Sequence, residues 1–124
     1  MSVLVKNIEH PDELRTMPNG NGQGAIVNLD GMLVARGELQ PGWRWFNDLR
    51  ALAGTVSCEF AHTGIVLAGC LHIEMDDGSG TDLRPGDVYY IPSGHDAWVV
   101  GNEIVHTIDW SPGNADFARP PAGS

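Results

Sequence analysis

Four side chains of this sequence are candidate ligands for a transition metal: one of its two thiols and three of its five imidazoles. They are Cys58, His62, His95 and His106. A thiolate combined with imidazoles suits zinc or another borderline metal, and three protein ligands leave one position open for water or substrate. The alternative is a site without metal, in which a buried thiol packs as a small hydrophobe and the histidines are only hydrogen-bonded.

His62 and His95 also suit a chemistry that needs no metal. Imidazole titrates near neutral pH, so these two residues could act as a general acid and base, tuned by burial or by Glu59 or Asp96. We therefore predict that His62 and His95 are the catalytic residues. His72 alternates with apolar neighbours in its segment and is expected at the surface.

Large amphipathic side chains are candidates for a substrate pocket, because a ring can stack on a flat or apolar ligand while its N–H or O–H finds a polar partner. In a strand, Trp43 and Trp45 would face one side, since Arg44 lies between them. Arg44 and Arg36 could bind a ligand carboxylate, or they could be solvated residues paired with acids. The predicted pocket residues are Trp43, Trp45, Glu59, Tyr90 and Trp98.

The composition predicts one small globular domain with an acidic surface. The 124 residues include 16 Asp and Glu against 7 Lys and Arg, and the net charge of −9 repels phosphate backbones and anionic lipids. We expect neither nucleic acid nor a membrane as a partner. No apolar run reaches about 18 residues, and two cysteines are too few for a disulfide framework. A cytoplasmic location with free thiols is therefore expected.

Short apolar runs separated by Gly and Pro predict an all-β chain. Two short helices are expected, at 11–17 and 46–53. In the last run, alternation places His106 on one face with Ile104 and Ile108, so we expect His106 among apolar neighbours. The expected strands are 25–29, 32–39, 56–60, 63–67, 70–75, 88–91, 98–100 and 104–110.

Two segments carry a family resemblance. Residues 85–95 (PGDVYYIPSGH) resemble the second cupin motif, and residues 62–73 (HTGIVLAGCLHI) resemble the end of the first. The resemblance covers roughly residues 30–110 and implies an all-β, double-stranded β-helix barrel of the cupin or jelly-roll type, with the site in its mouth. One domain is expected, with an N-terminal extension and first strand (1–30), the cupin barrel (31–110) and a C-terminal tail (111–124).

The ligand positions depart from the usual cupin pattern of two histidines separated by one residue, then a glutamate and a later histidine. His62 stands at the glutamate position, and residues 57–59 (SCE) replace the histidine pair. Ala97 stands at the later histidine position, with His95 two residues before it. The resemblance implies a divalent zinc, iron, manganese or nickel ion. The predicted metal ligands are Cys58, His62, His95 and His106.

The resemblance also implies a small organic molecule as the ligand. The expected protein is a metal-dependent enzyme of the isomerase, cyclase, lyase or oxygenase type. The alternative is a ligand-binding or regulatory cupin without metal, because fold alone does not choose between the two. A homodimer is expected, since cupins commonly pair.

Overall fold

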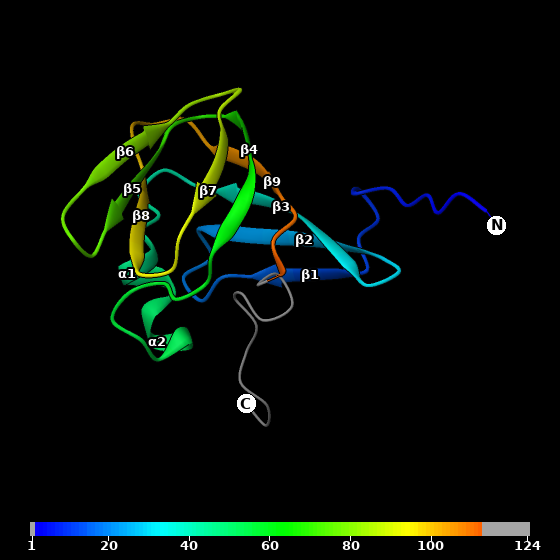
Figure 1. Cartoon of the computed structure of the whole chain (residues 1–124), viewed down its shortest axis with the longest axis horizontal. Helices are drawn as coiled ribbons and strands as arrows, with labels where there is room; N and C mark the ends of the chain where they lie inside the picture. Colours follow the sequence, from blue (N-terminus) through cyan, green and yellow to red (C-terminus); the bar gives the residue numbers. More distant parts are fainter. Residues whose placement is uncertain (1, 113–124) are drawn as a thin grey trace.

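The computed structural model describes residues 2–112, which are almost entirely β-structure (Figure 1). The first strands are β1 (Glu13–Thr16), β2 (Gly22–Leu29) and β3 (Met32–Leu39), followed by the short helices α1 (Trp45–Asp48) and α2 (Arg50–Ala53). The remaining strands are β4 (His62–Ala68), β5 (Leu71–Met75), β6 (Gly80–Leu83), β7 (Val88–Ile91), β8 (His95–Val99) and β9 (Val105–Asp109).

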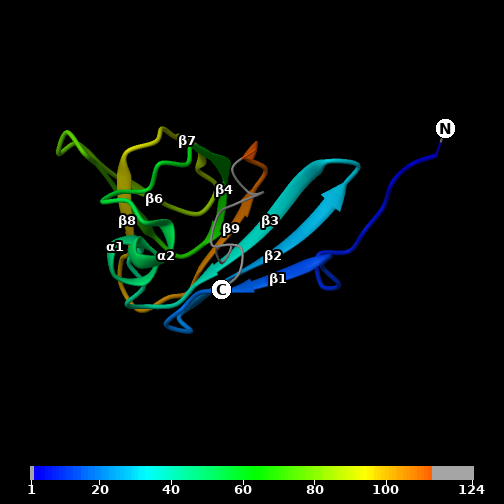
Figure 2. The ribbon, with the colours of Figure 1, turned by 90° about the horizontal axis from the view of Figure 1, so that it is seen from below.

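The strands form two antiparallel sheets that face each other (Figure 2). The larger sheet has the order β1-β2-β3-β9-β4-β7, and the smaller has the order β6-β5-β8. This arrangement confirms the all-β, jelly-roll type of fold expected from the sequence. Within residues 2–112 the sheets stay separate ladders, so hydrogen bonding does not close them into one continuous barrel.

Turn chemistry explains the longest hairpin. Leu29 pairs with Met32, which leaves Asp30 and Gly31 as a two-residue turn between β2 and β3. Both turn residues have positive φ, 52° and 94°, a conformation that Asp tolerates and that Gly adopts without strain. The hairpin therefore places the glycine-containing strands β2 and β3 side by side with a fixed register.

Two expected elements are wrong, and two strands, β1 and β6, were not expected. Residues 11–17 do not form a helix, because Glu13–Thr16 pairs along β2 as strand β1. Residues 56–60 do not form a strand, since only Cys58 makes a β-bridge there, to His95. Strand β6 was missed because its four residues, GTDL, show no apolar alternation. In each case pairing with another segment outweighs the local pattern.

The core lies between the two sheets, where Val66 and Val105 are completely buried. Strand β9 alternates as expected, but the face that is buried carries Val105, Thr107 and Asp109. His106 is only half-buried on the opposite face, so the expectation that it lies in an apolar core is wrong. The helices in the described range are too short and too polar to cross a membrane.

Candidate metal centre

Backbone hydrogen bonds hold Cys58 beside His95. The N–H of Cys58 donates to the His95 carbonyl at 2.7 Å, and the N–H of Gly94 donates to the Cys58 carbonyl at 2.7 Å. This bridge ties the loop after α2 to the first residue of β8. His62, the first residue of β4, lies next to them, and its ring centroid is 5.2 Å from that of His95. Three separate segments therefore bring the three side chains together.

The ligand atoms of these three residues converge. Cys58 Sγ lies 3.4 Å from His62 Nε2, and the three candidate donor atoms all lie within 4.8 Å of one another. Cys58 is 1% exposed and His95 is 3% exposed, so water does not surround the group. Among residues 2–112, this is the one group of three or more His, Cys, Asp and Glu side chains whose donor atoms lie close enough together to share a metal ion.

Each imidazole is oriented through its Nδ1 atom. His95 Nδ1 lies 2.8 Å from the Pro92 carbonyl, which can only accept, so Nδ1 is the donor there and Nε2 is left to face Cys58 and His62. His62 Nδ1 lies 3.6 Å from Asp109 Oδ2, while Nε2 faces Cys58. A carboxylate or a backbone carbonyl behind the imidazole is the usual support of metal-binding histidines.

Asp109 is itself fixed in place. Its Oδ1 accepts the Ser111 hydroxyl at 2.5 Å and the Ser111 N–H at 2.9 Å, and its Oδ2 accepts the Tyr89 hydroxyl at 3.3 Å. Burial disfavours the carboxylate, but hydrogen bonds from His62 and Ser111 outweigh burial and lower the pKa of Asp109. Asp109 therefore presents a negative charge to His62 at neutral pH.

The thiol and the imidazole of His62 are charged together. Burial opposes ionisation of Cys58, but hydrogen bonds from His62 and His95 outweigh it and lower the pKa of the thiol to about 7. Burial also opposes protonation of His62, yet Asp109 and Cys58 raise its pKa to about 9. The metal-free site therefore favours a thiolate beside an imidazolium, and a metal would replace the shared proton.

The donor set fits a tetrahedral transition metal. Zinc bonds of about 2.3 Å to sulfur and about 2.0 Å to nitrogen place these two atoms about 3.5 Å apart in a tetrahedral site. The observed Cys58 Sγ to His62 Nε2 distance is 3.4 Å. Three ligands leave a fourth position for water or substrate, which is the pattern of catalytic zinc sites rather than structural ones.

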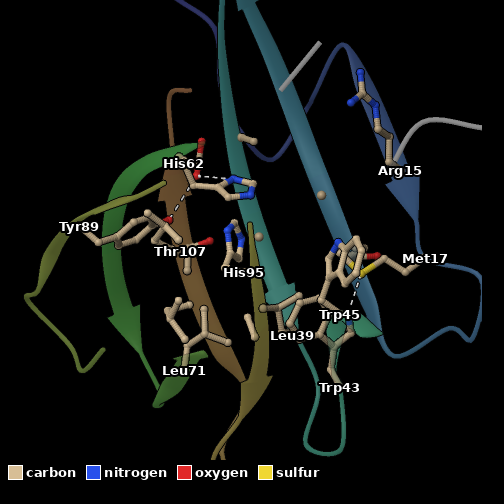
Figure 3. A pocket seen from close by; sticks show the side chains of 18 of the residues that line it. Arg15, Met17, Leu39, Trp43, Trp45, His62, Leu71, Tyr89, His95 and Thr107 are labelled. Atoms are coloured by element: carbon tan, nitrogen blue, oxygen red, sulfur yellow. Dashed lines mark hydrogen bonds and ion pairs between the residues drawn. The ribbon is translucent and has the colours of Figure 1, made fainter. Parts of the chain in front are cut away.

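Two of the three residues, His62 and His95, line a cavity of about 110 Å³ between the two sheets. His62 and His95 lie on one side of it, and Trp43, Trp45 and Met17 lie on the other (Figure 3). The polar groups nearest the histidines are those of Thr107, Tyr89 and Asp109, and most of the remaining wall is apolar. The cavity therefore joins a polar end to a mostly apolar wall, in which Arg15 and Gln23 are the polar residues.

The structure places the other predicted site residues differently. Trp43 and Trp45 line the cavity and are 3% and 2% exposed. Tyr90 is 68% exposed on β7, and Glu59 is exposed beside Cys58. Trp98 stacks on the His72 ring, with centroids 4.5 Å apart. None of these three lines the cavity.

His106 and the two arginines also lie away from the cavity. His106 pairs with Glu38 across β3 and β9, on the face opposite Thr107. Arg36 forms ion pairs with Glu9 and Glu38, and Arg44 forms one with Asp96.

Sequence reasoning did not select several residues of the site. Asp109, Thr107 and Tyr89 lie on inward-facing positions of β9 and β7. Their only sequence signal is parity, since Asp109 and Thr107 share a face with buried Val105. That signal becomes informative only when the buried face of β9 is known.

Three solved structures illustrate the likeness of this chain to known proteins. A protein of unknown function (DUF1255) from Acidithiobacillus ferrooxidans has a TM-score of 0.60 and 24% identity, over 82% of this chain and 88% of that one. KdgF from Halomonas sp. has a TM-score of 0.59 and 20% identity, over 90% of this chain and 94% of that one. FeII HppE has a TM-score of 0.60 and 7% identity, over 86% of this chain and 58% of that one.

Sequence comparison adds no closer relative, because no protein-family model matches the chain and no curated protein does. At these identities the structural likeness concerns the fold and leaves the activity open. The two facing sheets, their antiparallel order and the neighbouring structures agree with the resemblance carried by residues 62–73 and 85–95. This chain has the cupin fold.

Proposed function

We propose that this protein is a metal-dependent cupin that acts on a small organic molecule, with Cys58, His62 and His95 as the metal ligands. The observation that carries the proposal is the convergence of these three donor atoms within 4.8 Å at the end of a cavity. The outward-directed Nδ1 atoms of both imidazoles support it, because they leave both Nε2 atoms available.

The donor set favours zinc or iron among the four metals expected from the sequence. Thiolate and imidazole ligands suit zinc and iron, whereas manganese prefers carboxylate and water oxygens. The fold is compatible with iron, since one structural neighbour is described as FeII HppE. A bound ion of this kind would supply Lewis acidity at the open fourth position.

The residues around the ligands have distinct roles in this proposal. Asp109 holds the Nδ1 proton of His62 and so keeps its Nε2 lone pair directed at the metal. Burial and the neighbouring Asp109 charge raise the pKa of Tyr89, which therefore stays a neutral hydroxyl. The apolar wall excludes water from the bound molecule, which strengthens polar interactions at the histidine end.

Metal content tests the proposal directly. Protein purified without an affinity tag, or reconstituted with Zn²⁺ or Fe²⁺, should hold about one ion per chain by elemental analysis, and chelation should lower its melting temperature. His62→Ala should remove most of the metal. His72→Ala is the matched control, because His72 lies outside the group, and it should retain the metal.

A wild-type chain that stays metal-free after reconstitution, with an unchanged melting temperature, would contradict the proposal. It would favour the alternative function, a ligand-binding cupin without metal. It would also favour a second candidate, in which Cys58 is a nucleophile with His62 as its base. That candidate has its own observation, since Sγ, Nε2, Nδ1 and the Asp109 carboxylate stand in sequence at 3.4 Å and 3.6 Å. Homodimer formation and the cytoplasmic location stay predictions.

A further inference from the structure

At two paired positions the floor of the cavity is bare of side chains, because both residues are glycine. Gly24 of β2 pairs with Gly37 of β3, and Gly37 pairs in turn with Thr107 of β9. Paired residues point to the same face of a sheet, so both glycines lie on the side that lines the cavity. Neighbouring strands lie about 4.8 Å apart, so Gly24 is about 10 Å from the Thr107 backbone. The bare floor therefore begins beside the histidine end and extends away from it.

The two glycines differ in what surrounds them. A Cβ atom added at Gly37 would lie 2.6 Å from Thr107 Oγ1, so packing explains that glycine. A Cβ atom added at Gly24 would meet nothing within 4 Å, and its backbone does not have positive φ. Neither packing nor backbone conformation requires glycine at position 24. Glycine at position 24 therefore keeps this part of the cavity open.

The wall beside this floor is apolar and aromatic on one side, and on the other it carries Arg15 of β1, a buried residue that pairs with Gly24. Trp43, Trp45 and Met17 lie together on the side away from the histidines (Figure 3). The indole N–H of Trp43 is directed at Met17 Sδ, 2.9 Å away, so it is turned toward the wall rather than toward a ligand. A molecule in this part of the cavity meets ring faces, backbone and Arg15, which all favour a flat ring.

The volume limits that group to about one ring. The cavity measures about 110 Å³, and an apolar cavity of about 150 Å³ is large enough to bind benzene.

We propose that the space over Gly24 is the specificity subsite of the metal centre and takes the single flat ring of a substrate whose oxygen donors reach the metal. The inference rests on the proposed function, because the metal holds the polar end of the substrate. Gly24 is a specificity-determining residue in this arrangement. Its missing side chain sets how far the ring extends from the histidine end.

Two hydroxamates with the same metal-binding head test the subsite. Acetohydroxamate carries a methyl group, and benzohydroxamate carries one aromatic ring. Burial of a ring-sized apolar surface is worth about 1.5–3 kcal/mol, so the metal-loaded protein should bind benzohydroxamate roughly 10- to 100-fold more tightly than acetohydroxamate. Calorimetry gives both affinities, and quenching of tryptophan fluorescence by benzohydroxamate would place its ring near Trp43 and Trp45.

Gly24→Leu fills the subsite without touching the metal ligands. It should remove the advantage of benzohydroxamate and leave acetohydroxamate affinity, metal content and melting temperature close to wild type. Thr16→Leu is the matched control, because it adds an apolar side chain to β1 on the exposed face and should change neither affinity. Gly24→Ala, which adds one methyl group, should give an intermediate loss and covers the case in which leucine disturbs folding.

The outcomes separate the two proposals. Equal affinity for the two hydroxamates, or full retention of the benzohydroxamate advantage in Gly24→Leu, overturns the subsite while the metal centre stands. A protein that binds no metal overturns the proposed function, and it is recognised by elemental analysis before any hydroxamate is added.

Discussion

Two histidines of this protein lie beside carboxylates, and they differ in where their ring nitrogens point. His62 directs Nδ1 at Asp109 and Nε2 at Cys58, in a buried group that also contains His95. His72 directs Nδ1 at Asp82, 2.6 Å away, and Nε2 at Glu74, 2.7 Å away. Both environments raise the pKa of the imidazole. Only the first brings several donor atoms to one point.

The difference shows that residue types do not define a metal centre. The His72 cluster has one imidazole between two acids, but the acids lie on opposite sides of the ring, so no single ion can reach all three. It is a surface ion-pair network on the outward face of β5 and β6, covered on one side by Trp98. The His62 group is buried, and its donor atoms face a shared space.

The largest expected difference between the clusters comes from removing the acid behind each histidine. Asp109→Asn removes the negative charge that orients His62, so metal affinity should fall roughly 10- to 100-fold. Asp82→Asn makes the same change beside His72 and should leave metal affinity unchanged. Competitive titration with a chromophoric chelator measures both, and a melting curve for each variant checks the fold. Equal metal affinity in both variants and the wild type would show that Asp109 does not support the metal ligand.

A second difference is expected in the titration of Cys58, and a Cys70→Ser background isolates its signal. In the chelator-treated protein the thiolate absorbance near 240 nm should titrate with a midpoint near the lowered pKa of about 7. His62→Ala removes the proton donor that favours the thiolate, so the midpoint should rise toward the ordinary range of a thiol. His72→Ala should not move it. A midpoint that is the same with and without His62 would contradict the thiolate–imidazolium pair.

The smallest expected effect concerns the stability contributed by His72. Its two carboxylate partners raise its pKa above the ordinary 6.5, with Glu74 as the leading cause. The folded state therefore binds the proton more tightly, so this stability is fully present below about pH 6.5 and is lost as pH rises through the raised pKa. His72→Gln should flatten this part of the curve of unfolding free energy against pH. The effect should be less than about 1 kcal/mol, because water screens surface ion pairs. An unchanged curve would mean that the ion pairs contribute nothing measurable.

Much of the fold follows from local pattern. Alternation and turn residues predicted strands 32–39 and 88–91 with the bounds that the structure has. They also placed a helical segment at 46–53, where α1 and α2 occur. Local pattern failed at 11–17 and 56–60, where the conformation depends on β2 and on His95 respectively. The expected tail beginning at residue 111 lies outside the described residues apart from 111–112, and Ser111 is buried against β4.

The residues of the candidate site also divide into those that the sequence indicated and those that it did not. Residue type together with the motif resemblance selected Cys58, His62 and His95, since residue type alone would also have selected Cys70 and His72. Nothing local marked Asp109 as the partner of His62. The same limitation explains why His106, equally able to bind metal in principle, was included among the predicted ligands.

By itself, the sequence determined the kinds of ligand available, the strand periodicity, and the fact that His106 and Asp109 cannot share a face of β9. Alternation fixes only that residues an odd number of positions apart in a strand point to opposite faces of the sheet. Which face of β9 is buried was decided by the packing of the larger sheet against the smaller one, and that packing turned Thr107 and Asp109 inward. The tertiary structure likewise brought Cys58 to His95, because hydrogen bonds between residues distant in sequence form only when the sheets have packed.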